Sequence, residues 1–220
     1  MRRPGASAWR ACLAYARGMQ QPGPRTALIV VDVQNDFADP SGGLAVSGGD
    51  RIFASVNREI ERALDAGRLI VATQDWHPEH TPHFARDGGV WPVHCVAGTW
   101  GSELHPSLAL PAGTPRVRKG ANGEDGYSGF MMRDPISGEI IPTELEEILR
   151  AARVDSVAVV GLATDYCVKA TALDAIRLGF PTVVLIDAIA AVDLQPGDGD
   201  RALEELRLAG VGLETTSGGS

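Results

Sequence analysis

Short runs of β-branched and aliphatic residues recur along this chain and alternate with amphipathic stretches. The runs predict strands at residues 26–33, 68–73, 156–161 and 182–186, with shorter ones at 116–118 and 211–214. A strand that is apolar at nearly every position is one buried on both faces, as in a parallel sheet. Between the runs, helical periodicity predicts helices at residues 50–66, 143–152, 165–178 and 201–208.

Strands that alternate with helices indicate βαβ units with right-handed crossovers. We therefore expect a three-layer α/β/α fold with a central, mainly parallel sheet, similar to a Rossmann fold. Neither an internal repeat nor a linker interrupts the pattern, so residues 26–214 are interpreted as one domain. Residues 1–25 are then expected to form a disordered N-terminal extension, and residues 215–220 a disordered tail.

Polar residues occupy the predicted carboxyl ends of four strands. Asp32 ends the first strand, Asp75 the second and Lys119 the short one, while Cys167 follows the strand at 156–161. Ligands in such sheets bind outside the carboxyl ends of the strands. We therefore expect these four side chains to converge on one site.

Cys167 lies in the sequence GLATDYC, where a strand turns into a helix. A thiol in the first turn of a helix lies near the positive end of the helix dipole, which predicts a pKa below the usual value of about 8.5 and a nucleophilic thiolate. The alternative is a buried, inert cysteine. The expected proximity of Asp32 and Lys119 favours the nucleophile.

Asp32 interrupts an apolar strand, where an acid is costly unless it is paired. Taken alone, Asp32 could cap the loop that follows, and Lys119 could be a solvated lysine. Taken together with Cys167, they suggest a catalytic group in which the lysine keeps the carboxylate ionised and the carboxylate accepts the thiol proton.

All five histidines fall between residues 77 and 105. Imidazole and carboxylate groups bind divalent metals such as zinc, iron or manganese. The candidate ligands are Asp75, His77, His83 and His94, with His80 as a competitor for the third histidine position. His105, which precedes a proline, is interpreted as structural.

The chain carries a net charge of −8, although residues 1–25 contain five arginines and no acidic residue. The acidic remainder argues against nucleic acid and anionic membranes as partners. No apolar run reaches the ~18 residues that a membrane helix needs.

The arginine-rich start fits either a transit peptide or an extended start, with Met19 as an alternative initiator. Three cysteines without framework spacing, Cys12 among them, indicate reduced thiols and a cytoplasmic location.

Several motifs resemble those of the nicotinamidases, a branch of the isochorismatase-like cysteine hydrolases. They are DVQNDF from Asp32, QDWHP from Gln74, WPVHCVAGT from Trp91, Lys119-Gly120 and ATDYCV from Ala163. The resemblance covers residues 26 to about 214. The cysteine motif is typical of the superfamily, and the metal motif is typical of the nicotinamidase branch.

The resemblance implies that Cys167 is the nucleophile, Asp32 the general base and acid, and Lys119 the third member of a triad. It implies a metal held by Asp75, His77 and His94, with His83 as a fourth ligand where many relatives carry serine. Phe37 and Trp91 would enclose a pyridine ring, with Tyr127 nearby. The backbone amides of Ala163 and Cys167 would form an oxyanion hole, with a cis peptide bond before Ala163.

The activity implied by this resemblance is hydrolysis of nicotinamide to nicotinate and ammonia through a cysteine thioester, in NAD salvage, with pyrazinamide as a second substrate. Either a monomer or a homo-oligomer is compatible with it. Three alternatives are a carbamoyl or ureido amidohydrolase, a metallohydrolase in which Cys167 is passive, and a non-catalytic metal-binding protein. Carbamoyl and ureido amidohydrolases generally lack this metal motif.

Overall fold

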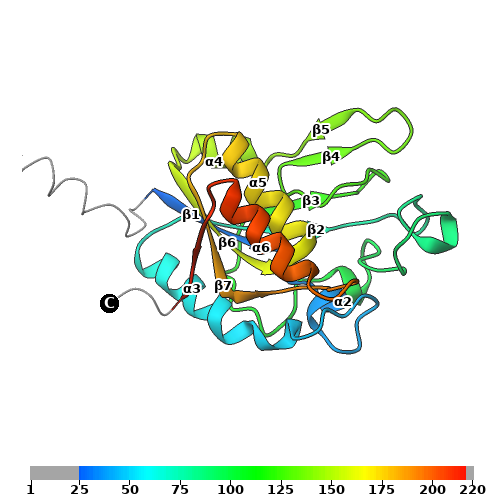
Figure 1. Ribbon diagram of the computed structural model, residues 1–220, viewed down its shortest axis with the longest axis horizontal. Coiled ribbons are helices and arrows are strands. Elements are labelled where there is room, and N and C mark those ends of the chain that lie inside the picture. Colours follow the sequence, from blue (N-terminus) through cyan, green and yellow to red (C-terminus); the bar gives the residue numbers. More distant parts are fainter. Residues whose placement is uncertain (1–24, 217–220) are drawn as a thin grey trace, which may run out of the picture.

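The apolar runs form one six-stranded parallel sheet in the computed structural model, which describes residues 25–216 (Figure 1). The strand order is β3-β2-β1-β6-β7-β8. These strands are β1 (Thr26–Val31), β2 (Ile70–Asp75), β3 (Arg116–Lys119), β6 (Ser156–Leu162), β7 (Thr182–Ala190) and β8 (Gly212–Glu214). Each neighbouring pair in this sheet is parallel, which confirms the predicted class.

Helices cover both faces of the sheet. They are α2 (Asn35–Ala38), α3 (Phe53–Asp65), α4 (Leu145–Ala151), α5 (Lys169–Arg177) and α6 (Asp198–Leu208). Strand β1 shows how the layers form, because alternate side chains of a strand point to opposite faces. Ile29 packs into a core with residues of α4, α5 and α6, whereas Val30 packs into a second core with residues of α3. The three-layer prediction is therefore confirmed (Figure 1).

The element bounds differ from the sequence prediction in several places. Strand β7 continues to Ala190, and α6 begins at Asp198, ahead of the predicted start. The predicted helix at 165–178 is divided into a π-helical turn, Thr164–Val168, and α5. The antiparallel hairpin of β4 (Met131–Arg133) and β5 (Ile140–Pro142) was not predicted.

The long connection between β2 and β3 contains only short 3-10 turns, at Ala85–Asp87 and Trp100–Ser102. An irregular segment of this length in a compact domain usually serves a functional site, so this connection is a candidate for one. Most of the candidate metal ligands lie in it, as described below.

The described chain extends beyond the predicted domain limit at residue 214. Thr216 is buried, and its backbone N–H and hydroxyl both donate to Asp187, at 2.8 and 2.5 Å. The prediction of a disordered tail starting at residue 215 is therefore wrong for Thr215 and Thr216. The predictions for residues 1–24, Cys12 and Met19 included, and for residues 217–220 lie outside the described residues. Between residues 25 and 216, no helix is long and apolar enough to cross a membrane.

Candidate active site

Four polar side chains meet at the carboxyl edge of the sheet. Asp75 is the last residue of β2 and lies in register with Lys119, the last residue of β3. Asp32 follows β1 directly, and Cys167 lies in the π-helical turn after β6. The parallel topology thus brings together residues that are up to 135 positions apart in the sequence, as the strand pattern predicted.

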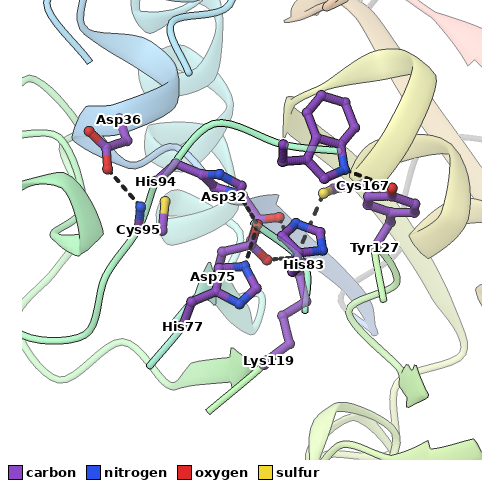
Figure 2. A network of polar contacts seen from close by, with 12 residues as sticks. Asp32, Asp36, Asp75, His77, His83, His94, Cys95, Lys119, Tyr127 and Cys167 are labelled. Atoms are coloured by element: carbon purple, nitrogen blue, oxygen red, sulfur yellow. Dashed lines mark hydrogen bonds and ion pairs between the residues drawn. The ribbon is translucent and has the colours of Figure 1, made fainter. Parts of the chain in front are cut away.

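Lys119 connects the other three side chains (Figure 2). Its Nζ lies 2.9 Å from Oδ2 of Asp32 and 3.6 Å from Sγ of Cys167, and it also forms an ion pair with Asp75. All four residues are at most 5% exposed. The hydroxyl of Thr73 donates a 2.6 Å hydrogen bond to Oδ1 of Asp32, so both oxygens of this carboxylate are held in place.

The proton affinity of Asp32 is set by opposing influences. Burial raises the pKa of Asp32 above its usual value, and the neighbouring carboxylate of Asp75 raises it further. The ammonium of Lys119 and the hydroxyl of Thr73 oppose this effect without reversing it. The influence of Lys119 has the predicted direction and favours the ionised carboxylate, whereas burial and Asp75 increase the affinity of Asp32 for a proton.

The prediction of a lowered pKa for Cys167 is wrong. Burial raises the pKa of the Cys167 thiol well above its usual value, and Asp32 and Asp75 add to the increase, while Lys119 acts against it. The helix-end argument overlooked how completely the thiol is removed from water. In the resting site the proton therefore stays on sulfur until a base next to it accepts the proton.

A cluster of imidazoles lies beside this group. One ring nitrogen from each of His77, His83 and His94 lies within 4.8 Å of the others. The Nε2 atoms of His77 and His94 are each 3.8 Å from Oδ2 of Asp75. The four predicted ligands are therefore adjacent, and Asp75 belongs to both groups (Figure 2).

The donor set fits a divalent metal. Both ring nitrogens of His77 are buried and have no hydrogen-bond partner, which is costly unless a cation or another group engages one of them. Nδ1 of His94 lies 2.7 Å from the carbonyl of Pro92, and Nδ1 of His83 lies 2.8 Å from Oδ1 of Asp125. Each contact leaves Nε2 of that histidine free to act as a ligand.

The protonation states also suit metal binding. Burial lowers the pKa of His94 to about 4, so this ring is neutral near pH 7 and keeps a lone pair for a metal. Although burial alone would raise the pKa of Asp75, Lys119 and the neighbouring histidines hold it below its usual value. An ionised carboxylate beside an imidazole with a lone pair is the form that a divalent cation requires.

The two remaining histidines lie outside this cluster. His80 is exposed, with Nδ1 3.1 Å from Asp87. His105 stacks on Phe53 and lies 3.6 Å from Asp39. The structure therefore places His83, and not His80, beside His77 and His94.

A cavity opens onto both groups. Its lining consists of Phe37, Leu44, Asp75, His83, Trp91, His94, Tyr127, Ala163, Tyr166, Cys167 and Val192. The indole N–H of Trp91 donates to the Tyr127 hydroxyl at 3.1 Å, and burial raises the pKa of Tyr127 to about 12. The cavity therefore has aromatic walls, with the Cys167 thiol and the imidazoles of His83 and His94 exposed to its interior.

Several residues of this site were not identified from the sequence. Tyr166 could have been identified from the sequence because it precedes Cys167 in the nucleophile motif. In the structure, its ring centroid lies 4.9 Å from that of Trp91. Leu44 and Val192 carry no chemical signal and come from distant loops. Asp125, the partner of His83, lies in a polar turn that the motif analysis did not single out.

The backbone next to the nucleophile has the cis peptide bond that the resemblance implied. The Leu162–Ala163 peptide bond is cis, and Ala163 lines the cavity together with Cys167. The carbonyl of Ala163 accepts hydrogen bonds from the N–H groups of Tyr166 and Val168, at 3.2 and 3.0 Å. These bonds fix the turn that carries the thiol.

Comparison with known proteins supplies a family. The isochorismatase domain family matches residues 26–217. The nicotinamidase of Escherichia coli (strain K12) is 39% identical over 208 residues, which cover 87% of this chain and 95% of that protein.

Two solved structures have the same fold. The pyrazinamidase of Pyrococcus horikoshii in complex with zinc has a TM-score of 0.78 and 42% identity, covering 87% of this chain and 99% of its own. A protein of L. infantum in complex with nicotinate has a TM-score of 0.80 and 36% identity. The match covers 90% of this chain and 96% of that protein.

Proposed function

This chain belongs to the isochorismatase domain family, and from that membership we propose that it is a nicotinamidase, which hydrolyses nicotinamide to nicotinate and ammonia. The enzyme is an amidohydrolase that acts on an amide C–N bond. The same chemistry extends to pyrazinamide, and the nicotinate released serves NAD salvage. Cys95 and Cys167 are free thiols, which fits the reducing cytoplasm.

One observation supports the roles that we assign to these residues. The Cys167 thiol and two members of the histidine cluster, His83 and His94, line the same aromatic cavity, so one small ring could contact both groups at once. A pyridine carboxamide has two groups at opposite ends of a ring, a basic nitrogen and a reactive carbonyl. The cavity offers a partner for each, and Phe37 and Trp91 offer the flat apolar surfaces between them.

In the proposed mechanism the Cys167 sulfur attacks the carboxamide carbon while Asp32 accepts the thiol proton. The raised pKa of Asp32 suits this role, because a carboxylate with high proton affinity is a stronger base. A carbon–sulfur bond forms, and the amide nitrogen leaves as ammonia when Asp32 returns the proton to it. Water then cleaves the thioester, with Asp32 accepting a proton from water and returning it to the sulfur.

Lys119 supplies positive charge throughout this cycle. Burial alone would lower its pKa, but Asp32 and Asp75 raise it well above the usual value, so the ammonium persists. At 3.6 Å from the sulfur, it stabilises the thiolate as the proton leaves. The backbone amides of Ala163 and Cys167 would bind the oxyanion, an interaction worth about 3–4 kcal/mol for each donor in studied hydrolases.

Asp75, His77, His83 and His94 would hold one divalent cation, zinc, iron or manganese, and that cation would supply the positive charge that binds the ring nitrogen of the substrate. The residues themselves set its position: Asp125 orients His83, and the carbonyl of Pro92 orients His94. This cluster therefore positions the substrate, while bond breaking is assigned to the thiol.

The test is ammonia release from nicotinamide by the purified protein and by Cys167→Ala, with metal content measured on the same samples. We expect turnover to be lost and metal content to be unchanged. Cys95→Ala is the matched control, because Cys95 is also buried but contacts the carbonyl of Gly101 at 3.8 Å. It should keep both activity and metal.

Other outcomes would identify the alternatives. Turnover that survives Cys167→Ala and disappears on chelation would indicate a metallohydrolase with a passive cysteine. Activity on carbamoyl or ureido compounds in preference to nicotinamide would indicate a different amidohydrolase. Absence of turnover on any amide in a panel would indicate a non-catalytic metal-binding protein.

A further inference from the structure

The ammonium of Lys119 lies where a metal ion could lie. Oxygen atoms of Asp32 and Asp75 and the sulfur of Cys167 are all within 4.8 Å of one another, and these three residues are buried. Nζ of Lys119 contacts all three of them. Two carboxylates and a thiol are a donor set that zinc and cobalt bind readily when no other cation is present.

Asp75 connects this group to the histidine cluster. Its Oδ1 atom pairs with Lys119, while its Oδ2 atom lies 3.8 Å from the Nε2 atoms of His77 and of His94. One carboxylate therefore faces a cation position with each of its oxygens. Sites that hold two metals, typically about 3.5–4 Å apart, use bridging groups in this way.

We propose that this site has the layout of a two-cation centre in which the Lys119 ammonium permanently fills the second position. The first position, among Asp75 and the histidines, takes a divalent metal. The second position would also take one if its ammonium were removed, and Cys167 would then become a ligand. Lys119 thereby keeps the nucleophile free of metal in a cavity that holds metal a few ångströms away.

The chemistry of the thiol makes this exclusion necessary. Zinc binds thiolate sulfur in preference to oxygen, and a sulfur bound to zinc is a poor nucleophile because its lone pairs are engaged. Metal binding at the second position would release the thiol proton to solvent and leave the sulfur bound to the metal. A fixed ammonium supplies the charge that the two carboxylates require, without forming a coordinate bond to the sulfur.

The test uses Lys119→Met, which removes the charge and retains a side chain of similar length. Native protein and variant are titrated with Co²⁺ and Zn²⁺, and metal bound per chain is measured after removal of the excess. We expect one metal per chain in the native protein and a second in Lys119→Met. The cobalt form of the variant should show a sulfur-to-cobalt charge-transfer band that the native protein lacks.

Two further variants identify the ligand and control for loss of a lysine. Cys167→Ser combined with Lys119→Met should abolish the charge-transfer band. Lys169→Met is the matched control, because Lys169 pairs with Glu205 at 3.0 Å and has no contact with the cluster among the described residues. It should bind one metal and show no band.

The proposal is overturned if Lys119→Met binds only one metal, or if the native cobalt protein shows the sulfur band. Should Lys119→Met fail to fold, Lys119→Gln supplies an amide that can still hydrogen-bond to the carboxylates, and the same titration applies. The inference rests on the proposed function for the first metal site. A native protein that binds no metal would contradict that site, whereas a native protein that binds two would contradict only the role of Lys119.

Discussion

At the scale of single residues, the Cys167 thiol is surrounded by two carboxylates and one ammonium, all of them removed from water. Removal from water disfavours every charged form, and the neighbouring charges then decide which groups ionise despite it. Lys119 keeps its proton and Asp75 loses its own, while Asp32 and Cys167 both have raised pKa values. In the proposed mechanism the proton that moves is therefore the thiol proton of Cys167, which Asp32 accepts.

The Asp125 carboxylate should strengthen metal binding through His83. Its Oδ1 lies 2.8 Å from Nδ1 of this histidine, which fixes the ring and raises the basicity of Nε2. Asp125→Ala should weaken metal affinity about 10–100-fold, the usual effect of losing such a partner. Competition with a metal-binding dye would measure the change.

A matched control is Asp87→Ala, because Asp87 pairs with the exposed His80 outside the metal cluster. Its metal affinity should equal that of the unmodified protein. Equal affinities in the Asp125 and Asp87 variants would mean that His83 does not depend on its carboxylate partner, or that His83 is no ligand.

The residues that bear chemistry were largely predictable from the sequence, but their proton affinities were not. Asp75 and Lys119 end β2 and β3, Asp32 directly follows β1, and parallel topology alone brings these strand ends together. The pKa of Cys167 depends on how much water surrounds the thiol, which no local motif encodes. Its predicted direction was wrong for that reason.

At the scale of elements, the turn after β3 limits the space available to a metal ligand. Gly120 has φ of +82°, and a Cβ atom added there would lie 2.7 Å from Nδ1 of His77. Gly120→Ala should therefore displace the His77 ring and weaken metal binding. In addition, an alanine in this left-handed backbone conformation should lower the folding stability by about 1–2 kcal/mol.

Gly123, in the same turn, separates these two effects. Its φ is +89°, but an added Cβ would meet nothing within 4 Å. Gly123→Ala should lose a similar amount of stability and retain metal affinity. Urea unfolding and metal titration of both variants check the pair, and a loss of metal affinity in Gly123→Ala would rule out the steric explanation.

Helix α3 contains a carboxylate that should make stability depend on pH. Burial raises the pKa of Glu59, although Arg62 and Arg68 lie 3.6 and 3.8 Å from its carboxylate. A folded-state pKa above the unfolded one means that the folded protein holds this proton more tightly. The contribution is most favourable below the unfolded pKa, near 4.5, and is lost as pH rises through the folded pKa.

Glu59→Gln should therefore be more stable relative to the parent protein at pH 7 than at pH 4. Urea unfolding at both pH values measures this difference. Glu61→Gln, at an exposed position of the same helix, is the control and should show a smaller dependence on pH. An advantage of Glu59→Gln that is larger at pH 4 would contradict the stated direction.

Elements with strong apolar periodicity were predictable, and the weak ones were not. The buried strands β1, β2 and β6 appear as continuous runs because both their faces lie against helices. The hairpin of β4 and β5 has three-residue strands that are partly exposed, so no alternation marks it. The π-helical turn at Thr164–Val168 is only five residues long. Over so few residues, the spacing of apolar side chains does not distinguish a π-helix from an α-helix.

At the scale of the whole molecule, the metal cluster joins an irregular loop to the central sheet. His77, His83 and His94 come from the long loop after β2, and only Asp75 belongs to the sheet. A bound cation would therefore attach this loop to the sheet edge. Binding to the folded state alone stabilises it by RT ln(1 + [L]/Kd), about 2.7 kcal/mol at a free metal concentration 100 times Kd.

Chelation should accordingly lower the melting temperature, and added Zn²⁺ should restore it. Cys167→Ala should show the same shift, because sulfur is not a ligand of the first metal position. His77→Ala should show little or no change in melting temperature on chelation, because it lacks a proposed metal ligand. Both ring nitrogens of His77 are buried without hydrogen-bond partners, which fits that role. Differential scanning calorimetry of the three proteins, with and without chelator, separates the two functions of the site. A shift that disappears in Cys167→Ala would place the thiol in the metal site and contradict the division between substrate positioning and bond breaking.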